Sequence, residues 1–328
     1  MDIISSILEL PKQCRQAWRE ALTVDLPQDW DIKNIVICGM GGSALGAHTL
    51  QVSGSVKVPM VINNNYFLPS FASEESLVVL ASYSGNTEEV LSCAKDAIEK
   101  GCKIIGITSG GKLAERLNSN NIHAYIFDPK FNSTKQPRMG IGYNIFGVSA
   151  IFHNLGLFNG NDTEDVVENA INILEDNLEQ IKSDAQDIAK KLTGKFPVIF
   201  ASDYLVGNAH IFANQLNETA KSFSAYYSLP EANHHLLEGL KHPKIPAVAI
   251  FLGKHYPERI LERFKITQEI LEKNGWEVLS WSTDQEDQFT QSIQTLLFSS
   301  LVTAYLGLEY DEDTISISTV DYFKAKLG

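Results

Sequence analysis

The segment Asn34-Ile35-Val36-Ile37-Cys38-Gly39-Met40-Gly41-Gly42-Ser43 joins a short apolar run to a loop that contains three glycines. A short apolar run that opens into glycines is typical of a strand buried on both faces of a parallel sheet. Glycines let the backbone approach a ligand closely, and a helix that begins just after them points free N–H groups toward an anion. This segment therefore predicts a strand, an anion-binding loop and a helix, in that order.

The same alternation of strand and helix patterns continues along the chain. In the first half the clearest helical pattern is Thr87–Lys100, which has one apolar face and stops at Gly101. Such alternation predicts a doubly wound parallel sheet in each half, which is an α/β fold. The predicted strands are 34–38, 58–62, 77–81, 103–107, 124–127, 197–201, 247–251 and 276–281, and the predicted helices of the second half are 207–223, 258–273 and 292–306.

With 328 residues, the chain is long enough for two domains that each bury their own core. Asn161-Asp162-Thr163 offers N-cap residues to the acidic amphipathic stretch Glu164–Leu192, which predicts a long helix there. We therefore place the domain boundary near residue 160. Residues 1–160 are expected to form the first domain with a helical lead-in, and residues 161–328 the linker helix and the second domain.

The composition is that of an ordinary globular protein, with 44% hydrophobic and 20% charged residues. No apolar run approaches the ~20 residues that cross a bilayer, so we expect no membrane association. The start of the chain lacks the basic and apolar regions of a secretory signal. Scattered cysteines, three of them in apolar or helical contexts, favour reduced thiols and a cytoplasmic location. They are Cys14, Cys38, Cys93 and Cys102.

The net charge of −13 argues against a broad nucleic-acid-binding surface, which would need clustered Lys and Arg. The same charge repels an anionic substrate. A site for such a substrate must therefore supply local positive potential from backbone N–H groups and a few cations.

The glycine loop is ambiguous by itself, because Gly39-x-Gly41-x-x-Ala44 nearly fits a dinucleotide-binding fingerprint. Nucleotide binding, sugar-phosphate binding and simple tight packing all remain open at this point. Against a dinucleotide, the next predicted strand runs into Asn63-Asn64-Asn65 and carries no acidic residue to hold a ribose. The loop is also not a Walker motif, because no Gly-Lys-Ser/Thr follows it.

A second loop, Ser82-Tyr83-Ser84-Gly85-Asn86-Thr87, again lies between a predicted strand and a predicted helix. Hydroxyl groups can donate hydrogen bonds to phosphate without adding positive charge. An ordinary N-cap at Thr87 would explain one hydroxyl, but the loop contains three, at Ser82, Ser84 and Thr87. The loop therefore favours phosphate binding over capping alone.

The two loops together resemble the sugar isomerase (SIS) domain, a flavodoxin-like sheet that binds phosphosugars. Three further motifs are similar to those of the bifunctional phosphoglucose/phosphomannose isomerase family: Gln136-Pro137-Arg138-Met139-Gly140, Asn217-Glu218-Thr219-Ala220-Lys221 and Pro230-Glu231-Ala232-Asn233-His234. The resemblance covers nearly the whole chain. It implies two tandem SIS domains, joined here by the predicted long helix.

The family resemblance implies an activity and a set of roles. The activity is interconversion of glucose 6-phosphate, and of mannose 6-phosphate as a further expected substrate, with fructose 6-phosphate through a cis-enediolate. Glu218 would move the proton between C1 and C2, and Arg138 would stabilise the developing enediolate. Partial burial could raise the pKa of such a base toward working pH. The residues expected to bind the substrate phosphate are Gly42, Ser43, Ser82, Ser84 and Thr87.

Ring opening is assigned by the same resemblance to His234 and to a lysine near the C-terminus. The family has Asn after this histidine, whereas this chain has His235. In related isomerases the histidine reaches the site from the neighbouring subunit, which implies a homodimer with a shared active site. Lys324 aligns best as the lysine, with Lys326 two residues away. A small hydroxyl residue near it would make room at C2, and the candidates are Ser316, Ser318 and Thr319.

No cofactor or metal is expected, because the chain lacks HxxxH and CxxC motifs and adjacent His234 and His235 cannot chelate from one helix face. Three other functions remain as alternatives. They are a non-catalytic phosphosugar-binding regulator, an NAD-dependent oxidoreductase, and an isomerase or aminotransferase of amino-sugar phosphates.

Overall fold

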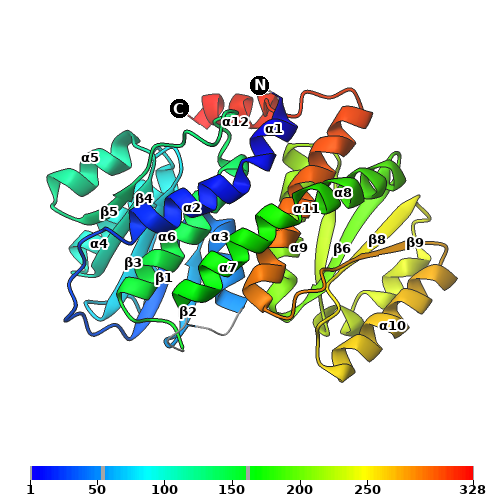
Figure 1. Cartoon of the computed structure of the whole chain (residues 1–328), viewed down its shortest axis with the longest axis horizontal. Helices are drawn as coiled ribbons and strands as arrows, with labels where there is room; N and C mark the ends of the chain where they lie inside the picture. The colour runs from blue at the N-terminus through cyan, green and yellow to red at the C-terminus, as the bar shows by residue number, and fades with distance from the viewer. Residues whose placement is uncertain (1, 53–55, 160–162, 328) are drawn as a thin grey trace.

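The computed structural model describes residues 2–52, 56–159 and 163–327. Two β-sheets lie on opposite sides of the molecule, with helices between and around them (Figure 1). The first sheet has the order β2-β1-β3-β4-β5 and the second the order β7-β6-β8-β9. All strand pairs within both sheets are parallel, which confirms the predicted fold of two doubly wound α/β units.

The strands of the first sheet match the apolar runs of the sequence to within two residues. β1 and β3 are central and buried along almost their entire length, as expected for strands covered by helices on both faces. The strand bounds are β1 (Asn34–Cys38), β2 (Met60–Asn63), β3 (Ser76–Ser82), β4 (Lys103–Thr108) and β5 (His123–Ile126).

The second sheet contains one strand that the sequence pattern did not predict. β7 is an edge strand with only one fully buried residue, so it lacks the continuous apolar run that marks the other strands. The bounds are β6 (Phe196–Ser202), β7 (Ala225–Leu229), β8 (Ala247–Leu252) and β9 (Glu277–Trp281).

Helices fill the space between the sheets and cover their outer faces (Figure 1). α6 and α11 are apolar and buried along most of their length, which is typical of helices inside a core. The bounds in the first half are α1 (Ile3–Leu8), α2 (Leu10–Ala21), α3 (Gly42–Val52), α4 (Glu88–Glu99), α5 (Gly111–Ser119) and α6 (Ile141–Asn154). Those in the second half are α7 (Thr163–Asp176), α8 (Leu178–Leu192), α9 (Val206–Glu218), α10 (Glu258–Lys273), α11 (Gln288–Glu309) and α12 (Ser318–Leu327).

The two halves meet through α3 and α9, which contact each other between the sheets. A Cβ atom added to Gly207 would lie 2.8 Å from the backbone of His48, so glycine at this position allows the two helices to approach closely. One continuous hydrophobic core runs through both halves. In this way α3, which follows the glycine loop, lies against α9, which ends at Glu218.

Two helix predictions need correction. The single long helix predicted over 164–192 is two helices, α7 and α8, that meet at Asn177. The Asn177 side chain donates a hydrogen bond to the Ile173 carbonyl at 2.8 Å, and such a side-chain bond competes with the helical ladder. Of the predicted N-cap, Asn161 and Asp162 lie outside the described residues, as does the predicted boundary at residue 160.

The helix predicted over 207–223 is also too long, because α9 ends at Glu218. Lys221 has a φ of 54°, a left-handed conformation that a helix interior does not contain, and β7 begins four residues later. Glu218 is therefore the last residue of a helix, where the prediction had it inside one.

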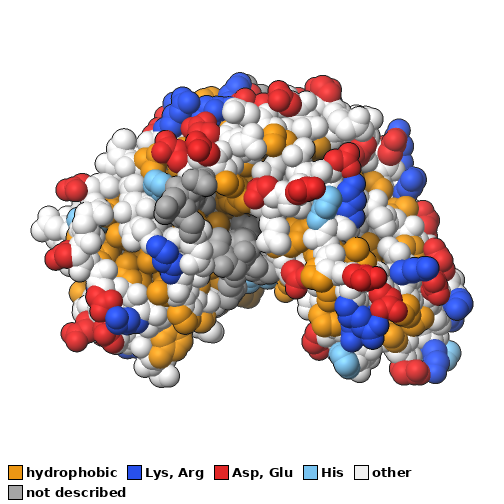
Figure 2. All heavy atoms as spheres, turned by 60° about the horizontal axis from the view of Figure 1, so that its bottom comes forward, with side chains coloured by type: hydrophobic (Ala, Val, Ile, Leu, Met, Phe, Trp, Pro, Cys, Tyr) orange, Lys and Arg blue, Asp and Glu red, His pale blue; other side chains and the backbone are white. Residues whose placement is uncertain are grey.

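The surface carries mainly acidic side chains, with basic ones interspersed, and it is hollowed between the two halves (Figure 2). None of the helices in the described parts of the chain is both long and apolar enough to span a membrane.

Candidate active site

The glycine loop packs directly against the segment that carries Arg138. β1 ends at Cys38, and α3 begins at Gly42. A Cβ atom at Gly42 would lie 3.0 Å from the Pro137 carbonyl oxygen and 3.1 Å from the Arg138 Cα, so a larger residue would push the two segments apart. The predicted anion-binding loop is therefore adjacent to the predicted cation.

Ser43 joins the two predicted phosphate loops. Its side chain is buried, and its hydroxyl oxygen accepts a hydrogen bond from the Tyr83 backbone N–H at 3.0 Å. Strands β1 and β3 are neighbours in the sheet, so their carboxyl ends bring the loops together. The Ser43 hydroxyl hydrogen remains available to a ligand, because the hydroxyl group has one donor in addition to its acceptor oxygen.

The Ser82–Thr87 loop is built around a hydrogen bond between its own hydroxyls. Ser82 Oγ and Thr87 Oγ1 lie 2.8 Å apart, and the Gly85 N–H donates to Ser82 Oγ at 3.1 Å. Thr87 occupies the N-cap position of α4, but its hydroxyl does not cap the helix. The capping alternative therefore does not explain this hydroxyl. Ser84 is exposed at the tip of the loop.

Arg138 is 3% exposed and is fixed by four hydrogen bonds. Its Nε donates to Thr219 Oγ1 at 3.0 Å and its Nη1 to Gln136 Oε1 at 3.0 Å. Its Nη2 donates to the Thr314 and Ile315 carbonyls at 2.9 and 2.7 Å. Burial lowers the pKa of Arg138, and the negative charges of Glu218 and Asp313 oppose this shift.

Glu218 faces the one N–H of Arg138 that these bonds leave unused. A guanidinium has five N–H groups, and the fifth belongs to Nη1, which lies 3.7 Å from Glu218 Oε2. The Glu218 side chain is 36% exposed, so its carboxylate is within reach of a ligand from solvent. A fixed cation and an accessible carboxylate therefore stand side by side, next to the glycine loop.

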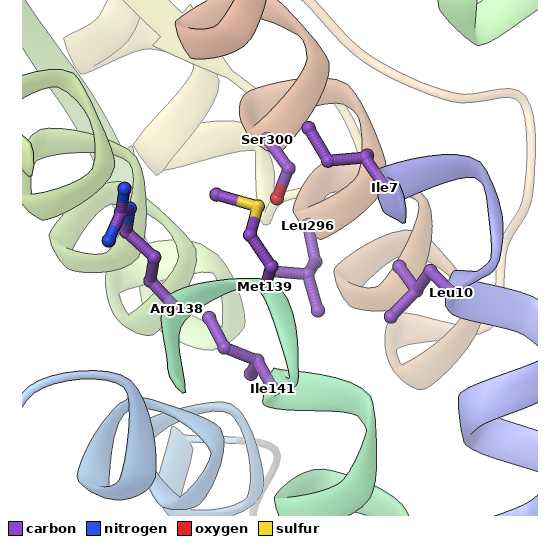
Figure 3. A pocket seen from close by; sticks show the side chains of 7 residues that line it. All are labelled: Ile7, Leu10, Arg138, Met139, Ile141, Leu296 and Ser300. Carbon is purple, nitrogen blue, oxygen red and sulfur yellow. The ribbon is translucent and has the colours of Figure 1, made fainter. Parts of the chain in front are cut away.

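The cavity behind Arg138 is too small for a substrate. It has a volume of about 10 Å³ and lies between η1 (Pro137–Met139), α1, α2 and α11. A cavity of this size holds at most about one water molecule. Figure 3 shows the Arg138 guanidinium pointing away from the other side chains that line this cavity. The functional side of Arg138 is therefore the side that faces Glu218.

Comparisons with known proteins bear on this arrangement. A sequence model of the bacterial phospho-glucose isomerase C-terminal SIS domain matches residues 181–327. The bifunctional phosphoglucose/phosphomannose isomerase of Aquifex aeolicus (strain VF5) is 31% identical, over 90% of this chain and 90% of its own. This chain belongs to the bifunctional phosphoglucose/phosphomannose isomerase family.

The D-glucosamine-6-phosphate 4-epimerase of Sulfolobus acidocaldarius is also similar to this chain, at 31% identity over 68% of this chain and 69% of its own. The solved C-terminal domain of glucosamine-fructose-6-phosphate aminotransferase from Francisella tularensis superposes with a TM-score of 0.76 at 15% identity, covering 96% of this chain and 98% of that domain. The second comparison concerns the fold alone. The tandem SIS architecture predicted from the family motifs is confirmed.

Two residues that the family resemblance assigns to the site lie away from it within this chain. His234 is exposed at the end of η3 (Glu231–His234), just after β7, whereas Glu218 precedes β7. β7 has five residues and spans about 13 Å, so the two side chains are on opposite edges of the second sheet. Lys324 is on α12, a helix described over its whole length in which no residue is buried.

Several residues that complete the Arg138 site were not predicted. Gln215 is 1% exposed and donates to the Arg138 carbonyl at 3.1 Å and to Ser300 Oγ at 2.9 Å. Lys221 Nζ donates to the carbonyls of Glu218 and Ser316, both at 2.7 Å. Thr219 and Lys221 both belong to the family motif around Glu218, which was a usable signal. The carbonyls of residues 314 and 315 gave none, because any residue type can supply a carbonyl.

Asp313 adds a negative charge near this cluster. It accepts hydrogen bonds from the Ile315 and Ser316 backbone N–H groups at 2.9 and 3.1 Å, and it also bonds the Ser316 hydroxyl. These bonds, led by that of the Ser316 hydroxyl, lower the pKa of Asp313 to about 2. Ser316, a candidate for the C2 pocket, therefore uses its hydroxyl in the turn before α12.

Within the described ranges, no group of three or more His, Cys, Asp or Glu side chains is placed to hold a metal ion.

Proposed function

We propose that this chain catalyses the reversible isomerisation of glucose 6-phosphate and of mannose 6-phosphate to fructose 6-phosphate by proton transfer. The observation that carries the proposal is the pairing of the buried Arg138 with the accessible Glu218 at 3.7 Å, beside two loops suited to a phosphate. A fixed cation next to a movable proton acceptor is what an enediolate intermediate requires.

The substrate phosphate would bind where the N-termini of α3 and α4 meet. Helix N-termini favour anions through their free N–H groups and their dipoles. The Ser43 and Ser84 hydroxyls are available as further donors, whereas Ser82 is fully buried and bonded to Thr87. Local donors of this kind would offset the net charge of −13, which opposes anion binding at long range.

Glu218 would remove the proton from C2 of the open-chain aldose and return it to C1 of the ketose. The negative charge that develops on the substrate oxygens would be stabilised by Arg138. Because its guanidinium is already held by Thr219, Gln136 and two backbone carbonyls, little reorganisation is needed during the reaction. Preorganised charge of this kind commonly accounts for more of an enzyme's rate enhancement than any other single effect.

His234 would act in the site of a second copy of the chain, because β7 separates it from Glu218 of its own chain. This reasoning supports a homodimer with shared active sites. The exposed apolar side chains of α12 also favour a partner in this region: Val320, Tyr322, Phe323 and Leu327 are 38%, 65%, 61% and 65% exposed. Lys324 of the same helix stays a candidate for ring opening, as does Lys326. A cytoplasmic location accords with four free cysteines.

Mixing two inactive variants tests the shared site. In a mixture of E218Q and H234A chains, half of the dimers are mixed, and one of their two sites combines an intact Glu218 with an intact His234. Activity should therefore recover to about a quarter of the wild-type value after subunit exchange. Size-exclusion chromatography should show dimers for both variants. No recovery from exchanging dimers would contradict the shared site.

A panel of substrates tests the reaction itself. Fructose 6-phosphate is incubated with the protein in the presence of EDTA, and the products are followed by NMR. We expect both glucose 6-phosphate and mannose 6-phosphate. Because one relative is named a D-glucosamine-6-phosphate 4-epimerase, glucosamine 6-phosphate is included. Turnover of the amino sugar alone would replace our proposal with that activity, and no turnover of any of them would refute an isomerase.

A further inference from the structure

Two cysteines lie together beneath the phosphate loops. Cys38 is the last residue of β1 and Cys93 lies in α4, and both side chains belong to the same buried cluster. They are 1% and 0% exposed. α4 covers the face of the sheet on which Cys38 lies, so the two sulfur atoms face each other across the interface between strand and helix.

Asn63 contacts both sulfur atoms. Its side-chain amide nitrogen lies 3.3 Å from Cys93 Sγ and 3.8 Å from Cys38 Sγ. Asn63 pairs with Cys38 in the register of β1 and β2, and the Cys93 thiol donates to the Asn65 carbonyl at 3.1 Å. An amide that donates to two sulfur atoms stabilises negative charge on them, which is the state in which a thiol reacts.

The pair lies beneath an open hollow in the surface. This hollow has a volume of about 650 Å³, and its lining includes Asn63, Asn65 and the exposed side chains of Tyr66 and Phe67. Asn63 and Asn65 are also the residues that contact the thiols. A small oxidant in the hollow is therefore separated from Cys93 only by this loop.

We propose that Cys38 and Cys93 form a redox-active dithiol that a peroxide converts reversibly into a disulfide, and that the oxidised protein binds sugar phosphate less tightly. The second part rests on the proposed function. Cys38 directly precedes the glycine loop, and α4, which carries Cys93, directly follows the Ser82–Thr87 loop. A bond about 2 Å long between their sulfurs fixes α4 to β1 and so changes the spacing of the two loops.

The chemistry needs one equivalent of peroxide. The Cys93 thiolate attacks one peroxide oxygen, the O–O bond breaks, and the departing hydroxide takes up a proton to become water. Cys93 is then a sulfenic acid. The Cys38 sulfur attacks the Cys93 sulfur, the S–O bond breaks, and a second water molecule leaves with the Cys38 proton. Two thiols and one peroxide thus give one disulfide and two waters.

The environment assigns the two roles. Hydrogen bonding with Cys38, together with Asn63, lowers the pKa of Cys93, whereas hydrogen bonding with Cys93 and burial raise the pKa of Cys38. Cys93 is therefore the attacking thiol and Cys38 the resolving one. Cys14 and Cys102 serve as controls, because Cys14 is fully buried in α2 and Cys102 is only partly buried before β4.

The full chain is treated with hydrogen peroxide under native conditions, remaining thiols are alkylated, and peptides are mapped by mass spectrometry. We expect a peptide pair linked through Cys38 and Cys93, lighter by two hydrogen atoms and released by dithiothreitol. C14A and C102A should give the same linkage, and C93A should not. A linkage through Cys102, or oxidation to sulfinic acid without any linkage, would overturn the dithiol.

The effect on ligand binding is measured separately, by the thermal stabilisation that glucose 6-phosphate gives to the reduced and oxidised protein. We expect oxidation to weaken apparent binding at least 10-fold, with recovery after reduction, and C93A to be insensitive to peroxide. Unchanged binding by the linked protein would overturn the coupling to the phosphate loops. Because neither readout uses turnover, a failure of the isomerase proposal would remain distinguishable from a failure of this one.

Discussion

The carboxyl edges of the two sheets follow the same strand order but are built for different purposes. In the first sheet, β1 and β3 end in loops of glycine and hydroxyl residues, with Ser84 exposed and Ser43 linking the loops. In the second sheet, the corresponding strands β6 and β8 lead to two buried tyrosines, Tyr204 and Tyr256. An architecture that repeats has therefore kept only one of its two edges open to an anion.

The tyrosines occupy the backbone groups that an anion would need. The Tyr256 hydroxyl accepts from the Ser202 N–H at 3.4 Å and donates to the Leu252 carbonyl at 2.8 Å. Tyr204 donates to Gln291 Oε1 at 2.6 Å, and Asp203 adds a negative charge in the loop after β6. The second half instead contributes Glu218, at the end of α9, to the site of the first half. Anion binding and proton transfer thus come from different halves of the chain.

Arg138→Lys should have the largest effect, because Arg138 connects the two halves. A lysine ammonium cannot bond Thr219, Gln136 and two carbonyls from one fixed geometry. We expect kcat to fall about 100-fold or more, as when a group that stabilises developing charge is lost. Steady-state kinetics with fructose 6-phosphate measure this.

Arg263→Lys is the matched control at the other edge. Arg263 Nη1 donates to Asn233 Oδ1 at 3.3 Å, near the carboxyl edge of the second sheet. If the two edges differ as described, this variant changes kcat less than twofold. Equal losses in both variants would show that Arg138 has no special role.

Ser84→Ala should raise KM and leave kcat nearly unchanged. The exposed hydroxyl is proposed to donate to the substrate phosphate, and a hydrogen bond to a charged group contributes about 1.5–3 kcal/mol, or roughly 10- to 100-fold in KM. Thr283→Ala removes a similar hydroxyl after β9, where Gln285 N–H donates to Thr283 Oγ1 at 3.2 Å. KM should be unaffected there. An unchanged KM in the Ser84 variant would remove that residue from the phosphate site.

Tyr256→Phe should affect stability and not substrate binding. Its hydroxyl satisfies two backbone groups of the second sheet, and leaving such buried groups unpaired costs about 1–3 kcal/mol. We expect a Tm lower by several degrees in a thermal unfolding experiment, with KM for glucose 6-phosphate unchanged. A rise in KM would mean that the second edge also binds substrate.

The contact between α3 and α9 should weaken in acid. The rings of His48 and His210 lie 5.1 Å apart there, and burial together with His210 lowers the pKa of His48 to about 4. Because the unfolded chain binds the proton more tightly, this histidine's stabilisation is complete above about pH 6.5 and is lost as the pH falls toward 4. His48→Gln should flatten the decline of Tm between these pH values by a few degrees. An unchanged pH profile would contradict this assignment.

The buried strands were predictable because each is a continuous apolar run, and β1 matches its predicted bounds. β7 was not, because an edge strand with the sequence Ala225-Tyr226-Tyr227-Ser228-Leu229 carries no such run. The end of α9 was also missed, since nothing near Glu218 in the sequence stops a helix. It ends there through contacts made by Thr219 with Arg138, a residue 81 positions away.

The site was predictable where it depends on sequence motifs and not where it depends on tertiary contacts. The motifs around Arg138 and Glu218 indicated both residues, and the structure brings them together. The carbonyls of Thr314 and Ile315, which hold the same guanidinium, come from positions 176 and 177 residues away. No local pattern encodes a contact of that kind. The position of His234 relative to Glu218 likewise became apparent only from the placement of β7.

Solvent deuterium exchange with wild-type protein and E218Q tests the central claim most directly. In D2O, the wild-type protein should introduce deuterium at C2 of glucose 6-phosphate during isomerisation, as followed by NMR. E218Q should abolish both exchange and isomerisation while still being stabilised against unfolding by glucose 6-phosphate. Exchange at the wild-type rate in E218Q would contradict the assignment of Glu218 as the residue that moves the proton.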